Sequence, residues 1–237
     1  EKLTLTDHTT EYSTLIVTGP ESRAAFERIE TEADLAASWL SIQPAKVAGV
    51  SCALARVSFA GEVGWEIHAA NADIPALYDA VLGAGAKPFG MYALNSMRIE
   101  KGYRAWKGDL STDYSLLEAG MERFIRFDKP HNVPGKAARL SEKQQGVKKR
   151  FVTLIVEAGD QDAPYLAPVY HNGEVVGETT SGDWGYRVNE SIALGMVRSD
   201  LSEPGSVVEV EIFGKRCKAT VQPDQPLWDP QNERIRA

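Results

Sequence analysis

A single carboxylate, Glu66, follows a glycine-rich turn in the stretch SFAGEVGWEIHAA. Side chains on a strand alternate between faces, so we expect Glu66 and His68 on one face and Trp65 on the other. A hairpin would bring Phe59 near the pair. A carboxylate beside an aromatic ring can hold a planar heterocycle such as a pterin or guanine by two parallel hydrogen bonds. Alternatively, Glu66 is an exposed residue that pairs with a Lys or Arg for about 0–1 kcal/mol.

A second candidate is Arg98 in the stretch ALNSMRIEKG, one helical turn after Leu94. It could anchor an acidic ligand tail, or its stem could cover its own helix. Trp106 and Trp184 are expected in loops next to glycine, where a large ring either serves a ligand or fills a packing gap.

The elements that would position Glu66 and Arg98 follow the order β-α-β-β-α in the first part of the chain. Residues 12–18 read as a strand, and the segment before the glycine-rich turn as another, with Ala53, Ala55, Val57 and Phe59 on one face. A capped amphipathic helix and a further helix over about 89–101 follow. This order is typical of the split βαβ, ferredoxin-like arrangement, an antiparallel sheet with helices.

From Phe151 onward the pattern indicates strands alone, with Asn172-Gly173 as the strongest hairpin signal. The polar run SEKQQGVKKR precedes this change. We therefore predict an α+β protein with a first domain over residues 1–150 and a small all-β barrel or jelly-roll domain over 151–237.

The amino-acid composition limits the classes of function that this chain can have. The 237 residues are 43% hydrophobic and 25% charged, with no apolar run long enough for a membrane span. Residues 151–237 hold 7 Lys and Arg against 14 Asp and Glu, so the net charge of −7 comes from this third, and no basic excess favours nucleic acid.

Cys52 and Cys217 lack metal-ligand or disulfide-framework spacing, so we expect no metal site. We also expect a reducing compartment, either the cytoplasm or the mitochondrial matrix of a eukaryote. The opening residues carry no secretory signal and read as the continuation of a longer chain.

Several motifs carry a family resemblance: FAGEVGWEI, FGMYALNSMRIEKGYRAWKGDL, LEAGMERFIRFDKP, GKAA and GEVVGETTSGDWGY, in this order. The chain resembles the folate-binding C-terminal part of dimethylglycine and sarcosine dehydrogenases, which is itself similar to the aminomethyltransferase, or T-protein, of the glycine cleavage system. The resemblance implies a tetrahydrofolate site in which Glu66 binds the pterin edge. By motif, Phe59 stands where the family often has tyrosine, which retains a ring without a hydroxyl, and Arg98 matches the arginine at the ligand end of its helix.

The resemblance also implies chemistry beyond this chain. An FAD-containing portion would oxidise an N-methylated glycine to an iminium, and N5 of tetrahydrofolate would capture its methylene as 5,10-methylenetetrahydrofolate. No dinucleotide-binding fingerprint occurs here, so we expect FAD on other sequence of a parent chain. The acidic residue that assists transfer in the family would precede Glu1, so we expect no catalytic residue in this chain and no activity from it alone.

Two other functions compete with this interpretation. One is a folate-binding accessory protein of the kind that supports iron-sulfur cluster assembly; those proteins share a cysteine-containing K-G-C-Y-x-G-Q-E motif, where this chain has EKGYRAWKGDL. The other is a non-catalytic docking module, in which a Glu66→Gln change would have no functional effect.

Overall fold

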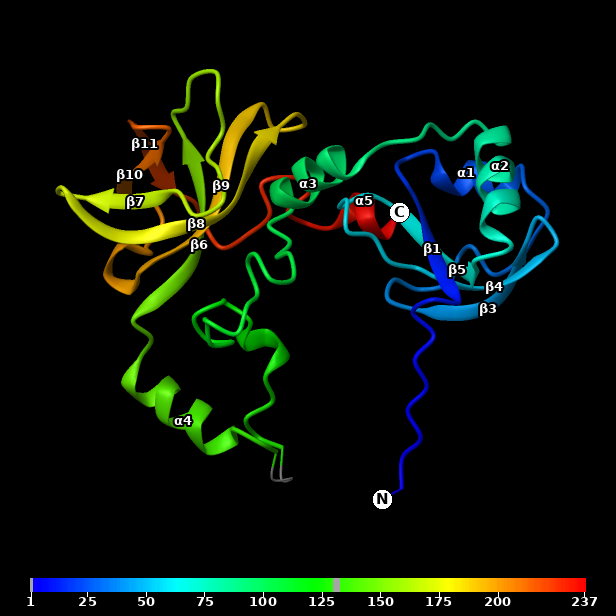
Figure 1. The fold of residues 1–237 in the computed structure, drawn as a ribbon, viewed down its shortest axis with the longest axis horizontal. Helices are drawn as coiled ribbons and strands as arrows, with labels where there is room; N and C mark the ends of the chain where they lie inside the picture. The colour runs from blue at the N-terminus through cyan, green and yellow to red at the C-terminus, as the bar shows by residue number, and fades with distance from the viewer. Residues whose placement is uncertain (1, 130–132) are drawn as a thin grey trace. The chain divides into compact units, whose positions relative to one another are not determined.

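The computed structural model describes residues 2–129 and 133–237 (Figure 1). Its helices and strands are β1 (Tyr12–Thr18), α1 (Ser22–Glu27), β2 (Thr31–Glu32), β3 (Ile42–Val47), β4 (Val50–Ala55), β5 (Gly64–Ala70), α2 (Ile74–Gly83), α3 (Met91–Glu100), η1 (Glu122–Phe124), α4 (Lys136–Gln145), β6 (Lys149–Val156), β7 (Pro168–His171), β8 (Glu174–Gly185), β9 (Glu190–Arg198), η2 (Ser199–Leu201), β10 (Val207–Ile212), β11 (Lys215–Val221) and α5 (Glu233–Arg236). The α+β fold class is confirmed.

The chain forms two compact units. Unit 1 contains the chain up to Leu94 and again Asp229–Ala237, and unit 2 contains Asn95–Trp228. The red C-terminal end of the ribbon accordingly returns to unit 1 (Figure 1). This division differs from the domain boundary expected near residue 150, a position that lies within the first barrel strand, β6.

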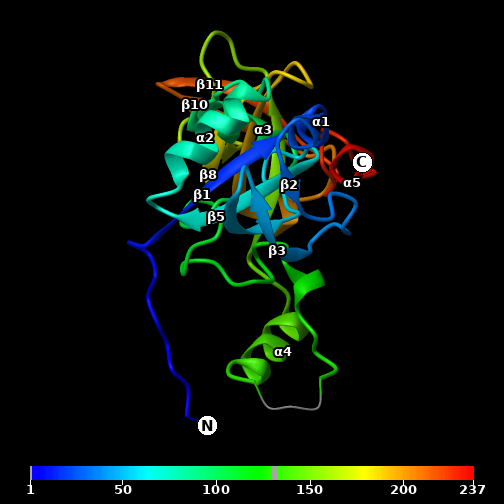
Figure 2. The ribbon, with the colours of Figure 1, turned by 90° about the vertical axis from the view of Figure 1, so that its right-hand side faces the viewer.

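Unit 1 is a five-stranded antiparallel sheet in the order β1-β5-β4-β3-β2. Helices α1 and α2 lie on one face of it (Figures 1 and 2). Its core contains Trp65 and Ile67 from β5, Leu54 from β4 and Phe26 from α1. The rings of Phe26 and Trp65 meet edge to face with centroids 5.1 Å apart, an arrangement that aromatic pairs prefer.

Two strand predictions in unit 1 need correction. β4 ends at Ala55, where its ladder with β5 also ends, at the pair formed with Glu66. Val57 and Phe59 are therefore not on a strand, although β4 and β5 do pair as predicted. β3, which contains Pro44, was not predicted.

Unit 2 contains a closed antiparallel barrel in the order β10-β11-β6-β9-β8-β7. The predicted hairpin at Asn172-Gly173 is confirmed: the two residues have φ of 51° and 83° between β7 and β8, the left-handed pair that a type I′ turn requires. Two predictions differ from the structure. Trp184 lies within β8 and not in a loop, and the part of the chain after Phe151 contains η2 and α5 as well as strands.

Candidate functional site

The candidate site lies on strand β5, which runs between β1 and β4. Trp65 and Ile67 are fully buried in the core of unit 1, whereas Glu66 and His68 lie on the opposite face with 28% and 38% of their side-chain surface exposed. The predicted sharing of one face by Glu66 and His68 is confirmed, since Nε2 of His68 is 3.2 Å from Oε2 of Glu66.

His68 orients the Glu66 carboxylate and is itself held from the neighbouring strand. Thr14 of β1 lies opposite His68 in the ladder, and its hydroxyl is 2.9 Å from Nδ1 of the imidazole. With neutral imidazole, the Thr14 hydroxyl donates to Nδ1 and the Nε2 proton faces Glu66. Within the part of the chain that the structure describes, Oε1 of Glu66 has no hydrogen-bond partner. The arrangement therefore presents a carboxylate with one oxygen against His68 and the other available.

The turn before β5 sets the direction of Glu66. Gly64 lies opposite Thr18, and a Cβ added there would come within 2.8 Å of the Thr18 hydroxyl, so only glycine fits without displacement. The carbonyl of Val63 accepts from the amide of Gly19 at 2.9 Å and from the hydroxyls of Thr18 and Ser22, both at 3.1 Å. These contacts hold the turn against the end of β1 and the start of α1.

Phe59 and Arg56 flank this turn. Phe59 lies in a bend between β4 and β5 and is partly buried. Arg56 is 2% exposed, donates from Nη1 to the Gly64 carbonyl at 3.2 Å and has its guanidinium 4.6 Å from the centre of the Trp65 ring. Burial, together with the charge of Arg23, lowers the pKa of Arg56. Neither Thr14 nor Arg56 was singled out from the sequence.

A shallow depression of about 520 Å³ adjoins His68 on the sheet. Its lining comes from the first strand and the β3–β4 pair, and includes Tyr12, Ile42, Pro44 and Ala53. Tyr12 and Ile42 are both more than half exposed. The surface beside His68 thus offers a largely apolar, open platform on which a flat ring can lie, and Glu66 contacts His68 without lining the depression itself.

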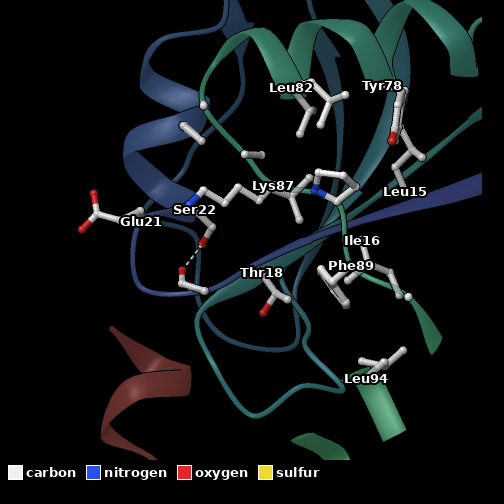
Figure 3. Close-up of a pocket in the computed structure, with 18 of the residues that line it drawn as sticks. Leu15, Ile16, Thr18, Glu21, Ser22, Tyr78, Leu82, Lys87, Phe89 and Leu94 are labelled. Carbon is white, nitrogen blue, oxygen red and sulfur yellow. Dashed lines mark hydrogen bonds between the residues drawn. The ribbon is translucent and has the colours of Figure 1, made fainter. Parts of the chain in front are cut away.

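A more enclosed hollow of about 540 Å³ occurs elsewhere in unit 1, between β1, α1, α2 and the segment that follows α2 (Figure 3). Leu15, Tyr78, Leu82 and Phe89 line it, and the dashed line in Figure 3 marks the Ser22 hydroxyl donating to the Gly19 carbonyl at 2.7 Å. None of the predicted site residues lines this hollow. Its walls are mostly apolar, although Glu21, Arg28 and Lys87 also line it, and the Ser22 hydroxyl already has acceptors.

Arg98 belongs to a buried polar network in unit 2. Its five donors all have acceptors: Nε and Nη2 donate to the Asn95 amide oxygen, Nη1 to the Tyr103 carbonyl and to Asp109, and Nη2 also to the Ser181 hydroxyl. Arg98 is 4% exposed and Asp109 is fully buried. To bind a ligand tail, Arg98 would have to give up one of these bonds, so its assignment as a ligand contact stays a prediction.

The other residues singled out from the sequence do not lie on strand β5. Trp106 is 74% exposed beside an isolated bridge to Leu110. Cys52 and Cys217 are free thiols, and burial raises the pKa of Cys52. Across residues 2–129 and 133–237, no group of three or more His, Cys, Asp and Glu side chains is arranged to hold a metal ion, and no helix is long and apolar enough to cross a bilayer.

Comparison with known proteins identifies the family. A family model described as the GCVT N-terminal domain matches residues 1–129, and one described as the glycine cleavage T-protein C-terminal barrel domain matches residues 149–229. The chain is 37% identical to human mitochondrial dimethylglycine dehydrogenase and 33% identical to mouse mitochondrial sarcosine dehydrogenase, alignments that cover 96% and 98% of this chain but only 27% and 26% of those proteins. It thus spans about a quarter of the length of these relatives.

A shorter relative and a solved structure are also similar to this chain. The chain is 30% identical to an aminomethyltransferase of Listeria monocytogenes, over 93% of this chain and 61% of that protein. The crystal structure of the glycine cleavage system aminomethyltransferase T from Bartonella henselae superposes with a TM-score of 0.80 at 22% identity, over 92% of this chain and 60% of that one, which establishes a common fold. With two consecutive family models matched along most of its length, this chain belongs to the glycine cleavage T-protein, or aminomethyltransferase, family.

Proposed function

We propose that unit 1 binds the pterin ring of tetrahydrofolate through Glu66, and that the chain is the folate-binding part of a larger N-methylglycine dehydrogenase. The observation that carries this proposal is the Glu66 carboxylate, 3.2 Å from His68, which in turn lines an open, largely apolar platform. A pterin edge offers a ring N–H and an adjacent amino group, and an ionised carboxylate accepts both in parallel.

Each residue of the site has a distinct part in this proposal. Glu66 accepts from the pterin edge, while His68 and Thr14 fix the orientation of the carboxylate. Phe59 supplies a ring without a hydroxyl. Arg98 organises the network around Asp109, and its contact with the glutamate tail of folate is a prediction that would require one of its present bonds to open.

Bound tetrahydrofolate would supply N5, which takes up a one-carbon unit to give 5,10-methylenetetrahydrofolate. The protein's contribution is to hold the folate in one orientation, a proximity effect of the order of 7–11 kcal/mol in favourable cases. The proposal assigns no catalytic acid or base to this chain, which is expected to be inactive alone.

The described residues of this chain contain no dinucleotide-binding unit of the βαβ type that would hold FAD. All the strand ladders of its two sheets are antiparallel, whereas a dinucleotide-binding unit needs parallel strands joined through a helix. We therefore propose that FAD and the methylated amine bind another portion of a parent protein. The free thiols fit a reducing compartment, in keeping with a cytoplasmic or mitochondrial-matrix enzyme.

Calorimetric titration of tetrahydrofolate into the chain, and into a longer form extended through an FAD portion, tests the proposal. Glu66→Gln keeps an acceptor for His68 but replaces the available oxygen by an amide donor, so we expect affinity to fall by about 10- to 100-fold. The matched control is Glu27→Gln, an exposed carboxylate of α1 in the same unit, which should bind like the parent form. No binding by either length, or equal affinity for the two variants, would refute the proposal and favour a docking module.

A further inference from the structure

We propose that the segment of residues 229–237 is a positioning element of the Glu66 site. It holds Arg56, and through Arg56 it fixes the backbone of Gly64 at the start of β5. The inference rests on the proposed role of Glu66 in folate binding. Residues 230–237 lie outside the regions that the two family models match, so the family assignment does not account for this segment.

Arg56 links the segment to the turn. Its Nη1 donates to the Gly64 carbonyl at 3.2 Å and its Nη2 donates to the Ala237 carbonyl at 2.6 Å. Gly64 is two residues before Glu66 on the same strand. Because Arg56 is 2% exposed, removing Ala237 would leave one side of a buried guanidinium without its acceptor, and such a group either moves toward water or draws water in.

The surrounding contacts restrict Arg56 to this position. Its guanidinium lies over the buried Trp65 ring, as does that of Arg23 at 5.4 Å, and Arg23 also donates to the Ala237 carbonyl, at 2.9 Å. Two like charges over one ring need an acceptor between them, and the Ala237 carbonyl serves both.

The same segment contacts the turn from its other side. Ile235 of α5 is 1% exposed, which anchors the helix in unit 1. The neighbouring Arg234 is 3.9 Å from the carboxylate of Glu62, which is itself 7% exposed within the glycine-rich turn. The segment therefore contacts the turn at Glu62 and, through Arg56, at Gly64, the two sides of the bend that directs Glu66 onto its face.

A positioning role predicts that the segment matters for folate only when Glu66 is present. We would delete residues 233–237, and separately make Arg56→Lys, which keeps the charge but not the two-pronged contact. Arg236→Ala is the control, since Arg236 is an exposed cation of the same helix. Each change is made with Glu66 intact and with Glu66→Gln, and tetrahydrofolate affinity is measured by calorimetry.

We expect the deletion and Arg56→Lys each to weaken binding by about 5- to 50-fold with Glu66 intact, to have little further effect with Glu66→Gln, and Arg236→Ala to have no effect. Equal losses in both backgrounds would mean general destabilisation and would overturn the inference. So would full affinity in the deletion and in Arg56→Lys.

A second measurement separates this inference from the proposed function. The indole N–H resonance of Trp65, assigned by Trp65→Phe, reports the guanidinium above its ring without any folate. If no form binds tetrahydrofolate, the folate proposal fails, and a shifted resonance in the deletion and in Arg56→Lys would still support the coupling of the segment to the turn. An unchanged resonance would overturn that coupling as well.

Discussion

The Asp109 carboxylate in unit 2 offers a sharp test of whether the Arg98 network is a structural core. Asp109 is fully buried and accepts from Arg98 and from the Thr180 hydroxyl at 2.5 Å each, from the Ala105 amide at 2.7 Å and from the Ser181 hydroxyl at 2.9 Å. The change Asp109→Asn keeps the shape of this side chain but removes its charge and one of its two acceptor oxygens.

The loss of stability expected for Asp109→Asn follows from these contacts. Arg98 and the Ala105 amide approach one oxygen of Asp109, and Thr180 approaches the other, so an amide nitrogen in either position meets at least one donor that loses its acceptor. Arg98 also becomes a buried cation without a counter-charge, because it is only 4% exposed. Breaking a buried pair in this way costs about 3–5 kcal/mol, a large part of the roughly 5–15 kcal/mol that stabilises a domain.

Urea unfolding followed by circular dichroism measures this loss. The control is Asp128→Asn, whose carboxylate pairs with Arg126 at the surface with 72% of its side chain exposed, and which should change stability by no more than about 0.5 kcal/mol. Adding Arg98→Met to Asp109→Asn should recover part of the loss, because no unpaired charge then stays buried. A loss below about 1 kcal/mol for Asp109→Asn alone would refute this account of the network.

Two further predictions concern Gly64 at the start of β5 and the partly buried phenol of Tyr114. Gly64→Ala should destabilise unit 1 by about 1–3 kcal/mol in thermal unfolding, because its Cβ would meet Thr18 at 2.8 Å, whereas Gly83→Ala, at the end of α2 with open space around it, should be neutral or stabilise by up to about 1 kcal/mol. Burial and a 2.7 Å hydrogen bond to Glu178 raise the pKa of Tyr114, so its contribution to stability is complete below the ordinary phenol pKa of about 10 and is lost as the pH rises above it. In a spectrophotometric titration the Tyr114→Phe curve should therefore coincide with that of the parent chain up to about pH 11, and a phenolate missing from the variant near pH 10 would contradict this.

Local sequence patterns were sufficient to predict many of the strands, helices and turns of unit 1 and of the barrel. The alternation around Glu66 predicted its face correctly because Trp65 and Ile67 must both be buried in one core. The helix expected over about 89–101 is α3, Met91–Glu100, and Asn172-Gly173 forms the expected hairpin turn. In each case the deciding interactions lie within a few residues of the signal.

Features set by distant partners were not predicted. β3 contains Pro44 and polar neighbours, and it becomes a strand because β4 pairs with it throughout. Nothing within one helical turn reveals that Arg98 meets Ser181, 83 residues later. Arg56 likewise acquires its role from Ala237, 181 residues away.

The sheet of unit 1 differs from the closed barrel in having an edge strand, β1. Within the described residues, β1 pairs only with β5, and its seven residues, Tyr12–Thr18, include no charged side chain, proline or glycine. Natural proteins usually protect an edge strand with charged residues, proline or a covering segment, because an uncharged strand rich in β-branched residues is a template for pairing with another chain. A sample of this chain should therefore self-associate as its concentration rises, and a lysine in place of Ile16 should keep it dispersed.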